Sequence, residues 1–157
     1  MTAAEDVVRR MTERGLTLAV VECTTGGLLG HQIVSVPGAS KVFVVGLAAY
    51  GRKPKLDWLK VPAEVFEKYG SVHEETALAL AKAAREQMGV SVAIAETGIA
   101  SPTNNPERPG GLYGLAIAAE GYEQRERQIF PGDRLETMEA AAARLSAMIF
   151  EFLDATA

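Results

Sequence analysis

The sequence predicts a three-layer α/β domain whose sheet is mostly parallel and carries an antiparallel hairpin near its C-terminal end. Two patterns predict it. Over the first two-thirds of the chain, short apolar strand-like segments alternate with segments of helical spacing. Two further strand-like segments, 112–119 and 122–130, are separated only by Glu120-Gly121, which is typical of a hairpin. The chain has 157 residues and contains no repeat or linker, so we expect residues 1–157 to form a single domain.

The N-terminal half contains two predicted helices and two predicted strands. Thr2-Ala-Ala-Glu5 has the form of a capping box, and it predicts a helix that ends at Gly15. A buried strand over 16–21 and a helix over 25–34 follow, and Pro37-Gly38 breaks that helix. The apolar run 42–50 predicts the second strand.

The C-terminal half begins with short helices over 54–60 and 61–70. A second capping box, 71–74, predicts a helix from Ser71 to Met88, and a third buried strand follows over 91–96. Residues 97–110 are rich in Gly, Pro and Asn and predict a loop. A third box, 133–136, predicts a long final helix whose core-facing residues are Leu135, Met138, Leu145, Ile149 and Phe152.

Composition excludes several classes of protein. The net charge of -4 and the absence of a long basic patch argue against a nucleic-acid partner. No apolar run approaches the ~20 residues that span a bilayer, and the N-terminus lacks the apolar core of a signal peptide. One cysteine and two histidines, His31 and His73, make a disulfide impossible and a metal site unexpected. We therefore expect a cytoplasmic protein with no metal, no cofactor and no membrane partner.

Three unusual segments, 22–27, 50–55 and 96–102, lie at predicted strand ends. If these strands are parallel, the segments meet at one edge of the sheet, where α/β proteins bind ligands. The first offers Cys23 and backbone N–H groups that suit an anion, and the second offers Arg52 and Lys55. A nucleophile, a cation and N–H donors are the groups that amide hydrolysis requires.

Each of these residues also has a purely structural interpretation. A lone cysteine such as Cys23 is commonly a packed apolar residue. Glu22 is equally well placed to bind the following helix N-terminus as an acceptor. Tyr50 fits simple packing at a strand end, and Lys55 fits a solvated helix start. Spacing alone leaves both interpretations open.

Taken together, the segments resemble the C-terminal domain of the CinA (competence/damage-inducible) family, the family of nicotinamide mononucleotide deamidases. The resemblance covers nearly the whole chain and keeps the motif order. The family's Glu-Ser-Cys-Thr-Gly-Gly falls on residues 22–27, and its Ala-Tyr-Ser-Asn-Glu-Ala-Lys falls on 49–55. The remaining matches are Val-Pro-Gly at 36–38, Gly-Ala-Val-Ser-Glu-Glu at 70–75, Thr-Gly-Ile-Ala at 97–100 and Pro-Gly-Asp-Arg at 131–134.

The resemblance implies an amidohydrolase that converts nicotinamide mononucleotide and water into nicotinate mononucleotide and ammonia, a step of NAD salvage. It places Cys23 at the nucleophile position, Lys55 at the activating lysine and Tyr50 at an assisting tyrosine. The substrate-binding positions it implies are Glu22, Thr24, Thr25, Gly26, Gly27, Arg52, Thr97, Gly98, Ile99, Ala100 and Arg134. Family members often associate through this domain, which implies a homo-oligomer.

The departures from the family pattern cluster at the predicted site. The family's serine is Cys23, its cysteine is Thr24, and its glycine-rich loop is replaced by residues 101–105, which include Thr103. Three hypotheses remain. The chain is a cysteine-dependent amidohydrolase, a catalytically silent homologue that binds a nucleotide or a protein partner, or a hydrolase of another amide or ester.

Overall fold

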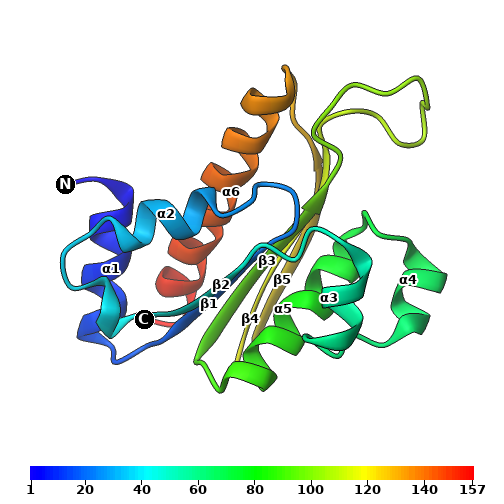
Figure 1. The fold of residues 1–157 in the computed structure, drawn as a ribbon. Coiled ribbons are helices and arrows are strands. Elements are labelled where there is room, and N and C mark those ends of the chain that lie inside the picture. The colour runs from blue at the N-terminus through cyan, green and yellow to red at the C-terminus, as the bar shows by residue number, and fades with distance from the viewer.

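A five-stranded mixed sheet lies between two layers of helices in the computed structural model, which describes residues 1–157 (Figure 1). The strands stand in the order β2-β1-β3-β4-β5. Their bounds are β1 Leu18–Glu22, β2 Phe43–Leu47, β3 Val92–Gly98, β4 Leu112–Ala119 and β5 Tyr122–Ile129. The predicted fold class is therefore confirmed.

The parallel half of the sheet supplies the edge at which the three unusual segments meet. β1 pairs in parallel with both β2 and β3, so the three strands end on the same side of the sheet. In this register Glu22 lies opposite Glu96. The hairpin of β4 and β5 continues the sheet in antiparallel fashion beyond β3, as predicted.

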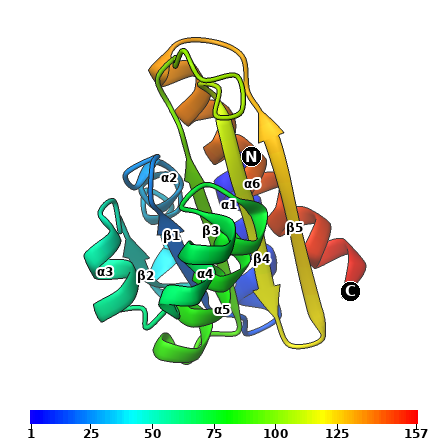
Figure 2. The ribbon, with the colours of Figure 1, turned by 90° about the vertical axis from the view of Figure 1, so that its right-hand side faces the viewer.

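The helices divide between the two faces of the sheet. α1, α2 and α6 cover one face, and α3, α4 and α5 lie on the other (Figures 1 and 2). Their bounds are α1 Ala3–Glu13, α2 Leu28–Val34, α3 Arg52–Asp57, α4 Ala63–Tyr69, α5 Glu74–Met88 and α6 Arg134–Ala155, with a 3-10 turn at Ala39–Lys41. None of these helices combines the length and the apolar character that a membrane crossing requires.

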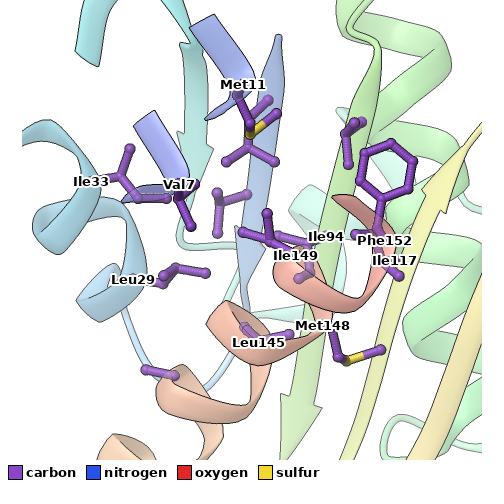
Figure 3. Close-up of a cluster of buried hydrophobic side chains, with 14 of the residues drawn as sticks. Val7, Met11, Leu29, Ile33, Ile94, Ile117, Leu145, Met148, Ile149 and Phe152 are labelled. Atoms are coloured by element: carbon purple, nitrogen blue, oxygen red, sulfur yellow. The ribbon is translucent and has the colours of Figure 1, made fainter. Parts of the chain in front are cut away.

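Two apolar cores hold the layers together. In the first, Met11 of α1, Leu29 of α2 and Leu145 of α6 pack against β1, β3 and β4 (Figure 3). In the second, Leu80 and its neighbours on α5 pack against the opposite face of the sheet. Burial of side chains on both faces removes the central strands β1 and β3 from water, which explains their nearly unbroken apolar sequences. The edge strand β2 is less buried, and its Val44 is 53% exposed.

Local sequence signals predicted two of the three capping boxes correctly. Thr2 with Glu5, and Asp133 with Glu136, form reciprocal capping boxes at the N-termini of α1 and α6. The box predicted over 71–74 is wrong. α5 begins at Glu74, and its N-cap is His73, whose Nδ1 accepts from the Glu75 N–H at 3.1 Å.

Two further expectations also need correction. The helix predicted from Thr25 begins only at Leu28, because Gly26 and Gly27 adopt positive φ values of 68° and 111° that end any helix. Leu135 was predicted to face the core but is 67% exposed. It lies two residues from buried Thr137, which is about 200° around the helix axis and so on the opposite side.

Candidate active site

A cavity of about 380 Å³ opens at the carboxyl ends of β1 and β3. The three segments predicted to converge do so, and each supplies part of its wall. The cavity is lined by Cys23, Thr24, Tyr50, Arg52, Lys55, Ser71, Val72, Thr97, Gly98, Ile99, Ala100, Ser101, Pro102, Thr103, Arg108 and Arg134. No group of three or more His, Cys, Asp or Glu side chains gathers where it could hold a metal ion.

One residue of β3, Glu96, fixes the turn that follows β1. The N–H of Cys23 donates to the backbone carbonyl of Glu96 at 3.2 Å. The N–H groups of Thr24 and Thr25 donate to Glu96 Oε1 at 2.7 and 2.8 Å. Three consecutive N–H groups of the segment predicted to suit an anion are therefore already bonded within the protein.

Glu22 occupies the start of α2 in the same way. Its Oε1 accepts from the Leu29 N–H at 2.8 Å, and its Oε2 accepts from the Gly30 N–H at 3.0 Å. The Thr25 hydroxyl donates to the same carboxyl at 2.7 Å. Glu22 is only 1% exposed and does not line the cavity, and neither do Thr25, Gly26 and Gly27. The structure thus supports the interpretation of Glu22 as a helix acceptor.

Cys23 and Lys55 meet at the floor of the cavity. Cys23 is 3% exposed, and Lys55, on the last turn of α3, is 5% exposed. Burial raises the pKa of the Cys23 thiol to about 12, against the opposing effect of the nearby Lys55 amine, and a negative charge on Glu96 would act in the same direction as burial. The thiol is therefore protonated at neutral pH, so attack by its sulfur needs a group that accepts the proton.

Arg134 spans the mouth of the cavity. From the first residue of α6, its Nη2 donates to the Tyr50 hydroxyl at 3.1 Å, and its Nη1 donates to Ser101 Oγ at 2.7 Å. Because the Tyr50 oxygen accepts this bond, the tyrosine's own hydrogen remains available to a ligand. Arg52 lies over the ring of Phe66, 5.3 Å from its centroid.

The threonines of the first and third segments tie backbone segments together. Thr24 Oγ1 donates to the Gly98 carbonyl at 3.1 Å and accepts from the Gly98 N–H at 2.8 Å. Thr97 Oγ1 donates to the Ser71 carbonyl at 2.6 Å. The Gly98 position excludes any side chain, because a Cβ there would lie 2.2 Å from the ring of Tyr113. These bonds consume both hydroxyl hydrogens, so Thr24 and Thr97 can reach a ligand only as acceptors.

The predicted site residues leave out six that line the cavity: Ser71, Val72, Ser101, Pro102, Thr103 and Arg108. Ser101 and Pro102 belong to the predicted segment 96–102, and Thr103 to the loop that departs from the family, so Ser71, Val72 and Arg108 are the residues that no site prediction covered. Arg108 had a detectable signal, since it precedes Pro109 at the end of the loop that replaces the family's glycines. That loop is closed by its own polar groups, with Thr103 Oγ1 donating to the Arg108 carbonyl and the Glu107 N–H donating to Asn105 Oδ1. Ser71 and Val72 lie in the family match at 70–75, but nothing in that motif points to a site, and only the fold brings them beside β3.

The charge of the cavity is one-sided. Its lining includes Arg52, Lys55, Arg108 and Arg134 and contains no Asp or Glu. The whole chain nevertheless has a formal net charge of -4. Four cationic side chains around a concave surface favour an anionic ligand.

The sequence model of the CinA C-terminal domain matches residues 1–153. The chain belongs to the CinA C-terminal domain family. A CinA-like protein of Gemmatimonas aurantiaca is 40% identical over 130 residues, which are 82% of this chain and 30% of that protein. A CinA-like protein of Akkermansia muciniphila is 42% identical over 130 residues, 82% of this chain and 31% of that protein. This CinA domain therefore spans about a third of the length of these relatives.

Solved structures of the family have the same fold. The competence/damage inducible protein CihA of Agrobacterium tumefaciens superposes with a TM-score of 0.87 at 28% identity, covering 98% of this chain and 97% of that one. A CinA superfamily protein of Enterobacter cloacae gives a TM-score of 0.89 at 26% identity, covering 98% and 93%. The agreement extends over nearly all of the described elements, including the hairpin and α6.

Proposed function

We propose that this CinA domain is an amidohydrolase that removes ammonia from the carboxamide of nicotinamide mononucleotide or a closely related pyridine nucleotide, with Cys23 as its nucleophile. One observation carries the proposal. The only thiol of the chain lies beside a buried lysine at the floor of a cavity whose charged side chains are all cationic. Such a cavity suits a substrate that carries a phosphate at one end and a carboxamide at the other.

The reaction follows the pattern of covalent amide hydrolysis. As the Cys23 sulfur bonds to the amide carbon, the Lys55 ammonium donates a proton to the departing nitrogen and receives the thiol proton in its place, so Lys55 ends the step with its charge unchanged. The C–N bond breaks, ammonia leaves, and a thioester remains. Water then adds to the thioester, the C–S bond breaks, and nicotinate mononucleotide leaves as the thiol recovers its proton.

The oxyanion of this reaction needs donors from outside the Cys23 turn. The N–H groups of Cys23, Thr24 and Thr25 are bound to Glu96. The Tyr50 hydroxyl, which keeps its own hydrogen, and the Lys55 amine are donors in the cavity lining that could take this role. Loss of one oxyanion donor costs about 100-fold or more in kcat, so Tyr50→Phe tests this role.

The deciding experiment is an assay of ammonia release from nicotinamide mononucleotide by the wild type and by Cys23→Ala. We expect turnover that the alanine variant abolishes. Lys55→Met should also abolish turnover, whereas Lys53→Met should not, because Lys53 is exposed, pairs with Asp57 and lies outside the cavity. Circular dichroism checks that each variant is folded. Turnover that survives in Cys23→Ala would rule out the proposed nucleophile.

One observation favours a second candidate, a silent homologue that binds a nucleotide without hydrolysing it. The pKa of Cys23, raised to about 12 by burial, leaves little thiolate at neutral pH. Calorimetry with nicotinamide mononucleotide separates the candidates, because a silent homologue binds the ligand and releases no ammonia. Restoration of turnover by Cys23→Ser would show that the remaining site is intact.

A further inference from the structure

We propose that Glu22 and Glu96 share a single proton beneath Cys23, with Glu96 held in the neutral form, and that neutral Glu96 is a positioning residue for the Cys23 turn. The shared proton follows from geometry alone. Its consequence for catalysis rests on the proposed function.

The geometry of Thr25 requires the extra proton. Its hydroxyl oxygen lies 2.7 Å from Glu22 Oε1 and 2.9 Å from Glu96 Oε1. A threonine hydroxyl has one hydrogen and can donate it to only one of the two oxygens. If both carboxyls were ionised, the carboxylate oxygen that receives no hydrogen from Thr25 would face a lone pair of the Thr25 oxygen at hydrogen-bond distance. A proton on one carboxyl turns that contact into a second hydrogen bond.

The hydrogen-bond partners identify Glu96 as the protonated carboxyl. Both oxygens of Glu22 accept from backbone N–H groups, those of Leu29 and Gly30, so a negative charge is satisfied there. Glu96 Oε2 is buried and has no partner at all. A charged oxygen left bare in the interior is far more costly than a neutral one. The protonated Glu96 carboxyl therefore donates from Oε1 to the Thr25 hydroxyl oxygen, and the Thr25 hydroxyl donates in turn to Glu22 Oε1.

The charges around this pair agree with that assignment. Neither carboxyl forms an ion pair, and the titratable groups that interact with Glu96 are Glu22 on β1, Cys23 after it and Tyr113 on β4. Burial raises the pKa of Glu96, and the Glu22 charge raises it too, against the opposing bonds from the Thr25 and Thr24 N–H groups. α2 contains no lysine or arginine, and the two arginines of α6 bond to other groups, Arg134 to Tyr50 and Ser101 and Arg144 to Glu126 and Glu151.

The consequence for Cys23 is both positional and electrostatic. The Glu96 carboxyl binds the N–H groups of Thr24 and Thr25, and its backbone carbonyl binds that of Cys23, so Glu96 helps to set the position of the sulfur relative to Lys55. An ionised Glu96 would oppose formation of the thiolate, since its charge raises the pKa of Cys23. The shared proton thus allows a carboxyl to hold the turn without repelling the charge that develops on sulfur.

Infrared spectroscopy tests the shared proton without any need for activity. At neutral pH the wild type should show the C=O stretch of a buried protonated carboxylic acid, and Glu96→Gln should lack it. Glu22→Gln is the matched variant, because Glu22 lies opposite Glu96 in the pairing of β1 with β3. We expect Glu96→Gln to lower the urea midpoint only slightly, because the amide oxygen still accepts both N–H groups and carries no charge, and only the bond to the Thr25 hydroxyl is lost. Glu22→Gln should lower it more, because an amide has only one acceptor oxygen for the N–H groups of Leu29 and Gly30.

Each outcome has a defined meaning. Absence of the carboxylic acid band in wild type, or equal losses of stability in the two glutamine variants, would overturn the shared proton. If wild type hydrolyses nicotinamide mononucleotide, Glu96→Gln should retain kcat within a few-fold. Glu96→Ala, which removes the acceptor of the Thr24 and Thr25 N–H groups, should lose about 100-fold in kcat with little change in KM. A kcat in Glu96→Ala equal to that of wild type would overturn the positioning role. Failure of the proposed function appears separately, as an inactive wild type that still shows the infrared band.

Discussion

Cys23 shows how far one residue can be interpreted from sequence. Its place at a strand-to-helix turn, and its convergence with Lys55, were predictable because parallel strands end at the same edge of a sheet. Its protonation state was not predictable. It depends on a burial of 97% and on Glu96, which lies 73 residues away in the sequence and is brought beneath the turn only by the pairing of β1 with β3.

The raised pKa of Cys23 makes a prediction about its reactivity. Because only the thiolate is alkylated, and the pKa is about 12, we expect the iodoacetamide rate to rise about tenfold per pH unit between pH 7 and 9 without a plateau. Lys55→Met should slow the reaction, since the Lys55 amine lowers that pKa. Cys23 is the only cysteine, so the mass of the intact protein reports the reaction directly. A plateau already reached near pH 7 would indicate a stable thiolate–ammonium pair instead.

Helices and strands were predictable wherever their signals are local. The capping boxes of α1 and α6, the apolar strands and the Glu120-Gly121 hairpin depend on residues within a few positions of one another. The start of α5 was mispredicted because a tertiary contact competes with the local signal. The Ser71 carbonyl accepts a hydrogen bond from the hydroxyl of Thr97, which lies 26 residues away in the sequence, and α5 begins only at Glu74.

The capping box at 133–136 forms and the one predicted at 71–74 does not, and this difference can be measured as a difference in stability. Asp133→Ala removes the acceptor of the Glu136 N–H, and we expect it to lower the free energy of unfolding by about 1 kcal/mol. Ser71→Ala is the matched change at the box that does not form, and we expect an effect within about 0.5 kcal/mol because its hydroxyl caps nothing. Urea denaturation of both variants gives the comparison. A loss in Ser71→Ala as large as that in Asp133→Ala would restore Ser71 as a cap.

The whole molecule combines a negative net charge with a cationic cavity, whose four cationic side chains come from three separate segments of the chain. Arg52 and Lys55 come from α3, Arg108 from the loop after β3, and Arg134 from α6. No single segment of the sequence shows this clustering, so only the fold makes the preference for an anion visible. The expected homo-oligomer and cytoplasmic location stay predictions, which sedimentation and cell fractionation would test.

The cationic cavity predicts which part of a nucleotide supplies the affinity. We expect nicotinamide mononucleotide to bind more tightly than nicotinamide riboside, which lacks the phosphate, and added salt to weaken only the former. Arg134→Met or Arg108→Met should weaken nucleotide binding by about 10- to 100-fold, the equivalent of one lost hydrogen bond to a charged group. Arg125→Met is the matched control, because Arg125 is a surface residue of β5 that pairs with Glu75 outside the cavity.

Calorimetry at low and high salt measures these affinities for both ligands. Equal affinity for the nucleotide and the riboside would mean that the cations do not serve a phosphate. They would then have to be explained by bonds within the protein, such as those from Arg134 to Tyr50 and Ser101. Because Arg134 already holds these two partners across the cavity mouth, a bound phosphate has to share or replace them. Tyr50→Phe, which removes one competing partner, should therefore leave nucleotide affinity unchanged or raise it, even where it lowers kcat.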